Sequence, residues 1–168
     1  MILGVQVIKI TNKLINELKG VNKYLTRPLK QKWVTERKFR QLTIELISAD
    51  SKFKFKLYMR QSTLHDNNFS CGISYIENGE NDLTLARYNG SSHVHVNKID
   101  NQRFDFQCHI HEANEECLKV AKKIEDYAIS TTRYGDLAGA IQCILLDYNI
   151  KDLNIGQLIE QGGLFDEV

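Results

Sequence analysis

Residues 52–60, KFKFKLYMR, alternate between two kinds of side chain, and this period of two constrains the fold more than any other feature of the chain. One set is apolar and comprises Phe53, Phe55, Leu57 and Met59. The other set is largely basic and comprises Lys52, Lys54, Lys56, Tyr58 and Arg60. Because successive side chains of a strand point to opposite faces of a sheet, the segment predicts a half-buried β-strand with a basic solvent face. The candidates for binding nucleic acid on that face are Lys52, Lys54, Lys56 and Arg60.

The same alternation recurs in neighbouring segments. Further strands are predicted for RQLTIELIS (40–48), FSCGISYIE (69–77), LTLARYN (83–89) and RFDFQCHIH (103–111), and HVHVN (93–97) alternates more briefly. Turn-forming runs such as NGEND and NGSS lie between these segments. Four or five strands joined by short turns predict a meandering antiparallel sheet.

Apolar residues with helical spacing lie on both sides of the strands. Thr11 or Asn12 can cap a helix near the N-terminus. Two more helices are expected over residues 113–130 and 137–150, and Asp136 can cap the second of them. The following residues, DLNIGQLIEQGGLF, favour a short final helix.

The order of these elements predicts the fold class. We expect an α+β fold in a single domain, residues 1–168, with an N-terminal helix, a meandering antiparallel sheet of four to five strands and two C-terminal helices packed on it.

Charge is unevenly distributed along the chain. Residues 1–60 carry 14 Lys and Arg against 4 Asp and Glu, although the whole chain has a net charge of +1. A basic first third suggests a surface that attracts a polyanion, although packing of complementary halves explains it equally. No apolar run reaches the roughly 18 residues that a membrane span needs, and the first residues lack a signal-peptide pattern. We therefore expect a cytoplasmic protein with reduced cysteines and no membrane partner.

Four of the five histidines lie between residues 93 and 111. They form two His-x-His pairs, His93 with His95 and His109 with His111. On a strand, the two imidazoles of such a pair share one face. We expect the two pairs on adjacent strands of one hairpin, with Arg87 and Arg103 turned toward the same surface.

Three interpretations fit this arrangement. The imidazoles could ligate zinc or a similar ion. Two of them could instead act as base and acid in RNA cleavage, with Arg87 and Arg103 holding the phosphate and Tyr88 stacking on a base or donating its hydroxyl. In the third interpretation they are ordinary side chains on the outer face of a sheet.

The segments LARYNGSSHVH and FDFQCHIH, followed by a helix ending AIQCILLDYNI, resemble an uncharacterised family of small proteins from bacteria and their prophages. More distantly, residues 83–150 are similar to the TumE-type toxins of toxin–antitoxin modules. Those toxins are thought to act on RNA and to pair with a helix-turn-helix antitoxin. By position, the resemblance points to Arg87, Tyr88, Asn89, His93, His95, Asn97, His109 and His111.

The resemblance favours an RNA-acting protein, a metal-independent endoribonuclease of toxin type from a bacterial or prophage module. Its expected partners are RNA and a helix-turn-helix antitoxin, and it needs no metal or other cofactor. The catalytic candidates are His93, His95, His109, His111, Arg87 and Tyr88, and Arg103 joins the nucleic-acid-binding candidates.

Two alternative functions stay open. One is a phage or mobile-element inhibitor of a host defence system, similar to anti-CRISPR proteins, which binds a nucleoprotein complex through the basic strand. The other is a metal-dependent hydrolase that uses the His-x-His pairs. An exposed sheet edge could also pair two copies into a homodimer.

Overall fold

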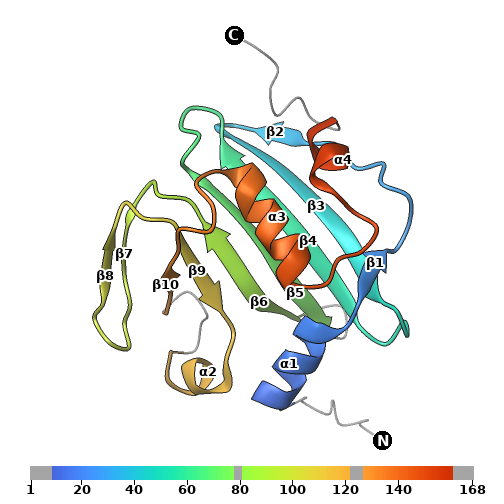
Figure 1. The fold of residues 1–168 in the computed structure, drawn as a ribbon, viewed down its shortest axis with the longest axis horizontal. Coiled ribbons are helices and arrows are strands. Elements are labelled where there is room, and N and C mark those ends of the chain that lie inside the picture. The colour runs from blue at the N-terminus through green and yellow to red at the C-terminus, as the bar shows by residue number, and fades with distance from the viewer. Residues whose placement is uncertain (1–8, 78–80, 122–126, 161–168) are drawn as a thin grey trace, which may run out of the picture.

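The computed structural model describes residues 9–77, 81–121 and 127–160 (Figure 1). Its centre is an antiparallel sheet with the strand order β1-β3-β4-β5-β6-β9-β10, in which β2 also pairs with β3. The strands of this sheet are β1 (Lys23–Leu25), β2 (Val34–Glu36), β3 (Phe39–Ser48), β4 (Lys54–Ser62), β5 (Phe69–Glu77), β6 (Asn81–Asn89), β9 (His109–Glu112) and β10 (Ile129–Ser130). A separate two-stranded sheet contains β7 (Val94–Val96) and β8 (Arg103–Asp105). The helices of the described residues are α1 (Asn12–Gly20), α2 (Glu115–Ala121), α3 (Leu137–Asp147) and α4 (Ile155–Glu160).

The predicted sheet of four to five strands is wrong, because eight strands of the described residues form the main sheet. The strands β1, β2 and β10 span only two or three residues, too few to show an alternating pattern. The structure also divides the predicted strand 103–111 into β8 and β9. Strand β10 falls inside the predicted helix 113–130, of which α2 forms the start; residues 122–126 lie outside the described residues.

Several predicted elements are confirmed. The side chain of Thr11 caps α1 by accepting a hydrogen bond from the backbone N–H of Leu14, and that of Asp136 caps α3 by accepting one from Gly139. The strands β3, β4, β5 and β6 correspond to the alternating segments 40–48, 52–60, 69–77 and 83–89. A short final helix, α4, is also present.

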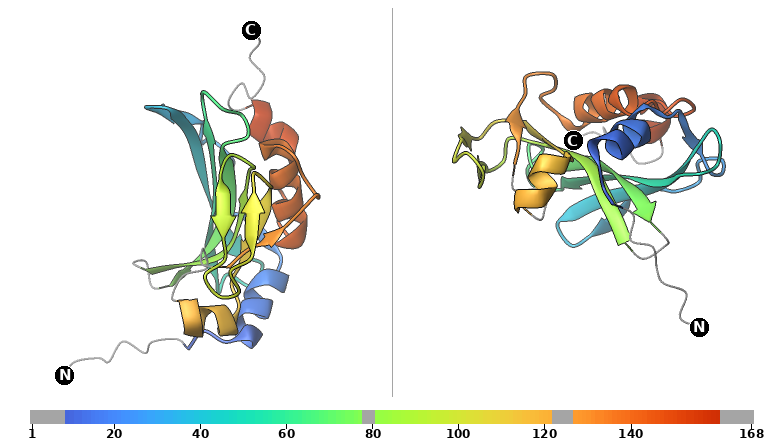
Figure 2. Two further views of the ribbon diagram at one scale, coloured as in Figure 1. Left: turned by 90° about the vertical axis from the view of Figure 1, so that its left-hand side faces the viewer. Right: turned by 90° about the horizontal axis from the view of Figure 1, so that it is seen from below.

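The helices α1, α3 and α4 lie on one face of the main sheet, called the core face (Figure 2). The core lies between this face and α3, and includes Leu57, Ile73 and Tyr88 from the strands and Ile141 and Ile144 from the helix. Helix α2, predicted to pack on the sheet, instead packs beside α1 in a small apolar cluster. No helix within the described ranges is long and apolar enough to cross a bilayer.

The opposite face of the sheet, called the polar face, carries the other set of strand side chains. Tyr58 and Arg60 of β4 point to it, as does Arg87 of β6. The ring of Tyr58 crosses β5 at Gly72, where a Cβ atom would overlap the tyrosine hydroxyl. Tyr58 accepts a hydrogen bond from Arg87 Nε across that glycine, at 3.1 Å.

Strand β1 buries the side chain of Lys23. The ammonium group of Lys23 donates hydrogen bonds to the carbonyl oxygens of Lys19, Val21 and Tyr148, at 3.1, 2.9 and 2.8 Å. Burial lowers the pKa of Lys23 to about 7. This lysine therefore joins α1, β1 and the end of α3 from inside the fold.

Candidate functional site

The pairing of β6 with β9 places the second histidine pair on the polar face. Arg87 lies opposite His111 in the antiparallel register, and Asn89 lies opposite His109. These residues share a face because they alternate with core-facing residues such as Tyr88. His109 and His111 are almost completely buried, with exposed fractions of 0% and 2%.

The first histidine pair reaches the same place from the other sheet. Strand β7 pairs with β8 and not with β9, so the prediction of adjacent strands in one hairpin is wrong. Phe106, between β8 and β9, has a φ of 50°, and this left-handed conformation interrupts the strand. The ribbon of β7 and β8 packs against β9, with the ring of Phe104 stacked 6.5 Å from that of His109.

The four imidazoles of His93, His95, His109 and His111 form one group, called the histidine cluster. Ring centres lie 5.1 Å apart for His93 and His109, and 5.0 Å apart for His95 and His109. His111 lies 4.9 Å from His95 and 5.2 Å from His109. His93 is exposed and His95 half-buried, so the cluster is closed on one side and open to solvent on the other.

Two rings of the cluster are oriented by backbone carbonyl groups. His109 Nδ1 lies 2.9 Å from the carbonyl oxygen of Gln107, and His111 Nδ1 lies 2.8 Å from that of Tyr127. A carbonyl oxygen only accepts hydrogen bonds, so both Nδ1 atoms donate. In the neutral rings Nε2 then carries the lone pair, and for His109 this atom accepts a hydrogen bond from the Asn89 amide at 3.2 Å.

Asn97 orients the third ring. Its side-chain oxygen accepts a hydrogen bond from the backbone N–H of Ala128 at 2.7 Å, and its amide donates to the carbonyl oxygen of the same residue at 3.0 Å. This pair of bonds fixes which end of the amide is oxygen. The same oxygen lies 3.0 Å from His95 Nε2, which must therefore donate. In the neutral ring of His95, Nδ1 carries the lone pair.

The environment disfavours the charged forms of His93 and His109. Burial lowers the pKa of His109 to about 4; the bond to Gln107 opposes this shift, and the neighbouring imidazoles add to it. Burial and the proximity of His95 also lower the pKa of His93. A neutral imidazole has one lone-pair nitrogen, which is the form that binds a metal ion.

The geometry suits a metal ion held by His95, His109 and His111. One ring nitrogen from each lies within 4.8 Å of those of the other two. Zinc–nitrogen bonds of about 2.0–2.1 Å place two tetrahedral ligand atoms roughly 3.4 Å apart, so binding requires the rings to approach by at most about 1.4 Å. Each ring has one nitrogen hydrogen-bonded to an oxygen, the arrangement typical of metal-bound histidine.

A hollow of about 240 Å³ lies beside the cluster on the polar face. Its polar and charged lining groups are Arg60, Asn68, Ser70, Arg87, Asn89 and His93. Arg60, Ser70, Asn89 and His109 are successive partners across β4, β5, β6 and β9, so they form one row on this face. The structure therefore brings Arg60 and Arg87 together with the histidines.

Tyr88 and Arg103, both predicted site residues, lie elsewhere. Tyr88 points to the core face, where its hydroxyl donates a 2.5 Å hydrogen bond to Asp147, and burial raises its pKa. Arg103 is exposed on β8 and forms an ion pair with Asp105 at 2.6 Å. The polar-face surface that the histidines share therefore includes Arg87 but neither of these two side chains.

Acidic side chains pair with part of the basic face that was predicted for residues 52–60. Lys52 pairs with Asp50 at 3.2 Å, and Lys56 pairs with Asp82 at 2.9 Å. Lys54 is exposed on β4 outside the hollow. Of the four residues predicted to bind nucleic acid on this strand, Arg60 alone lines the hollow.

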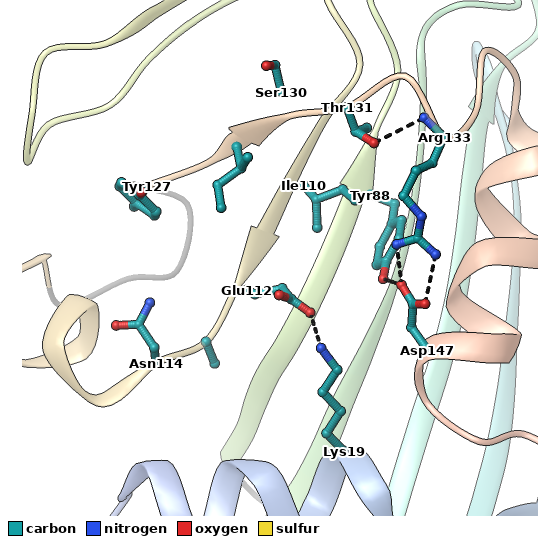
Figure 3. A pocket seen from close by; sticks show the side chains of 12 residues that line it. Lys19, Tyr88, Ile110, Glu112, Asn114, Tyr127, Ser130, Thr131, Arg133 and Asp147 are labelled. Carbon is teal, nitrogen blue, oxygen red and sulfur yellow. Dashed lines mark hydrogen bonds and ion pairs between the residues drawn. The ribbon is translucent and has the colours of Figure 1, made fainter.

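A second hollow of about 560 Å³ lies on the core face, between β9, β10 and the ends of α1 and α3 (Figure 3). Its charged groups are paired with one another: Lys19 with Glu112 at 2.7 Å, and Arg133 with Asp147 through two bonds of 2.7 and 2.8 Å. Because these pairs neutralise each other, the hollow presents no net charge to a ligand.

Sequence reasoning missed the oxygens that orient the rings. Gln107 and Tyr127 contribute backbone carbonyl groups, which any residue type would supply. Asn89 and Asn97 were indicated by the family resemblance alone. Comparison of the chain with protein-family models, curated proteins and solved structures gives no match, so the site is interpreted from its own geometry.

Proposed function

We propose that this protein is a metal-dependent hydrolase with a centre formed by His95, His109 and His111. The observation that carries the proposal is the set of hydrogen bonds behind the three rings. Each ring donates one N–H to an oxygen of the fold and has its lone pair on the other nitrogen. Such outer partners set the tautomer and orientation of metal-bound histidines. At His109 Nε2 the metal would replace the hydrogen bond from the Asn89 amide.

The ligand set supports a catalytic role over a structural one. Among the described residues the ligand set holds three imidazoles and no carboxylate or thiolate. Such a set would leave the full charge of the ion in place and one coordination position open, as in catalytic zinc sites. A bound ion of this class lowers the pKa of a coordinated water to about 7 and polarises the bond under attack. His93 stands beside this set on its exposed side, with its ring edge against His109.

A metal titration tests the proposal. Protein prepared without a histidine tag and stripped with a chelator should bind one Co²⁺ or Zn²⁺ per chain, with the visible absorption of tetrahedral Co²⁺. His95→Gln, His109→Gln and His111→Gln should each weaken binding by at least about 100-fold. His65→Gln, in an exposed loop, is the matched control and should bind as the parent does. Circular dichroism checks that each variant is folded.

His93→Gln decides between an open and a closed centre. An open three-histidine centre predicts that this variant keeps the parent's metal affinity. A loss as large as in the other three variants would make His93 a fourth ligand and the site a structural one, which contradicts a hydrolase. Absence of stoichiometric binding in the parent would contradict the metal centre itself.

A metal-free ribonuclease is the second candidate function. Arg87 and His93 line the same hollow, and the ring of His109 lies beside His93. This candidate is favoured because acid–base cleavage of RNA requires such groups close together. RNA cleavage that survives chelation and is lost in both His93→Ala and Arg87→Met would support this candidate. Cleavage abolished by chelation and restored by Zn²⁺ would support the hydrolase instead.

The other proposals from the sequence can be tested in cells. If the protein is a toxin, its expression should arrest growth, and a small helix-turn-helix partner should relieve the arrest. If it inhibits a defence system through the basic strand, reversal of Lys54 and Arg60 should abolish inhibition while the histidine variants stay active.

A further inference from the structure

The hollow beside the histidine cluster has the composition of an anion site. It contains two guanidinium groups, Arg60 and Arg87, and none of the described residues that line it carries a carboxylate. The amides of Asn68 and Asn89 and the hydroxyl of Ser70 add uncharged hydrogen-bonding groups. The described lining groups therefore carry two positive charges and no negative one, in a protein whose net charge is only +1.

Both guanidinium groups are held in place by aromatic rings. Arg60 stacks 3.6 Å from the ring centre of Phe39, a contact that uses the face of the guanidinium group and not its N–H edge. Arg87 lies 6.0 Å from the ring centre of Tyr58, to which its Nε also donates. Planar groups positioned in this way lose little freedom when they bind an oxyanion.

The backbone brings the loop before β5 close to the end of β6. Gly90 allows this approach, because a Cβ atom there would overlap the carbonyl oxygen of Asn67. The N–H of Gly90 donates to the carbonyl oxygen of Phe69 at 2.9 Å. Asn68 and Asn89, which are next to these residues in the chain, both line the hollow.

The hollow adjoins the proposed metal centre through two shared residues. His93 lines it and contacts the ring of His109, and the Asn89 amide donates to His109 Nε2. We propose that the hollow binds the phosphate group of a phosphate ester. This inference rests on the proposed function, because it names a phosphate ester as the substrate on which the adjacent metal centre would act.

Size and charge favour a phosphate ester over other anions. A volume of about 240 Å³ is below the roughly 300 Å³ of pockets for drug-sized ligands, so the hollow fits a small group and not a whole nucleotide. Two guanidinium groups match the several acceptor oxygens of a phosphate group, whose charge is −1 in a diester and close to −2 in a monoester, better than the two oxygens of a carboxylate.

Binding of inorganic phosphate to chelator-stripped protein tests the anion site without metal. Amide chemical shifts of Ser70, Asn89 and His93 should follow a saturable curve with one site. Arg60→Met and Arg87→Met should each weaken binding by about tenfold or more, because each removes a charge-assisted contact. Lys13→Met is the matched control: it removes one positive charge from the exposed surface of α1 and should stay within about twofold of the parent.

Further probes identify the source of the phosphate. Methyl phosphate should bind if the substrate is a phosphomonoester, and dimethyl phosphate if it is a phosphodiester such as a nucleic-acid backbone. Sodium acetate at equal ionic strength should produce no saturable shift. The inference is overturned if acetate binds equally well, if neither ester binds, or if both arginine variants behave as the parent does.

These outcomes are separable from those of the metal titration. Saturable phosphate binding in a protein that binds no metal would retain the anion site and contradict the proposed hydrolase. Phosphate binding that requires metal and is insensitive to Arg60→Met would place the anion on the metal, and would overturn the inference while the metal centre stands.

Discussion

Asn97 should determine how well His95 is presented to a metal ion. Both Asn97 and Ala128 are buried, with exposed fractions of 0% and 1%, and two hydrogen bonds join them. Asn97→Ala leaves the N–H and the carbonyl oxygen of Ala128 without these partners, at about 1–3 kcal/mol each. We expect the free energy of unfolding to fall by about 2–6 kcal/mol, against the roughly 5–15 kcal/mol of stability that a domain has.

The same substitution removes the oxygen to which His95 Nε2 donates. Without it, the ring can rotate and exchange its tautomer, so we expect metal affinity to fall by about 10–100-fold. Asn97→Asp separates the two effects. It retains an oxygen for His95 and for Ala128 N–H, but replaces the amide that donates to the Ala128 carbonyl. We expect Asn97→Asp to lose stability and yet to bind Co²⁺ within about threefold of the parent.

Two measurements check this expectation: urea unfolding of chelator-stripped protein and Co²⁺ titration against a competing chelator. Asn114→Ala is a control for a purely structural loss, because Asn114 accepts a hydrogen bond from Cys117 N–H at the start of α2. It should cost about 1 kcal/mol and leave metal affinity unchanged. If Asn97→Ala loses stability but binds Co²⁺ as tightly as the parent, the asparagine does not position His95 and the reasoning from tautomers fails.

Three further predictions concern other parts of the fold. Burial lowers the pKa of Lys23 to about 7, whereas an unfolded lysine titrates near 10.4, so the unfolded chain holds an extra proton between about pH 7 and 10.4. The free energy of unfolding should therefore rise with pH in this window, by up to about 1.4 kcal/mol per unit, and Lys23→Met should lack the rise in urea unfolding at pH 7 and 9. Gly90→Ala should cost about 1–3 kcal/mol because its methyl group would overlap the neighbouring loop, whereas Gly135→Ala, which has open space around it, should not; equal urea midpoints would contradict this. Burial raises the pKa of Asp147, but hydrogen bonds from Arg133 and Tyr88 bring this pKa below its usual value. That carboxylate stabilises the fold above the unfolded pKa of about 3.9 and loses its effect as pH falls. Tyr88→Phe should raise the pKa of Asp147 in an NMR titration and lower the free energy of unfolding by about 1–2 kcal/mol at pH 7. An unchanged pKa of Asp147 would show that the Tyr88 hydroxyl does not donate to this carboxylate.

The long strands could be predicted because each repeats its pattern over nine or ten residues. In β4, for example, Phe55, Leu57 and Met59 are buried while Lys54 and Arg60 are exposed. The short strands could not be predicted, since a strand of two or three residues is stabilised by its neighbour's backbone and not by its own side chains. Strand β10 shows this, because its Ile129 is exposed and pairs with β9 through main-chain atoms.

The concentration of histidines was visible in the sequence, but its burial was not. Alternation through RFDFQCHIH predicts that His109 and His111 share the exposed face of Arg103 and Asp105. The left-handed φ of Phe106 ends β8 before β9 begins, and the ribbon of β7 and β8 covers the polar face there, so the rings of His95 and Phe104 bury His109. A non-glycine residue in this conformation is uncommon, and nothing in the local sequence demands it.

What the cluster can do depends on groups that a motif does not contain. The His-x-His motif predicts only that two rings share a strand face. Which ring nitrogen can bind a ligand depends on which of the two donates a hydrogen bond to a neighbouring oxygen. For His109 and His111 that oxygen belongs to the backbone, so no side-chain pattern could reveal it. For His95 it belongs to Asn97, which is held by backbone groups 31 residues away. Of these three orienting oxygens, only that of Asn97 belongs to a side chain, so it is the only one that a substitution can remove. Variants of Asn97 therefore test the metal centre more directly than any change in the histidine motif.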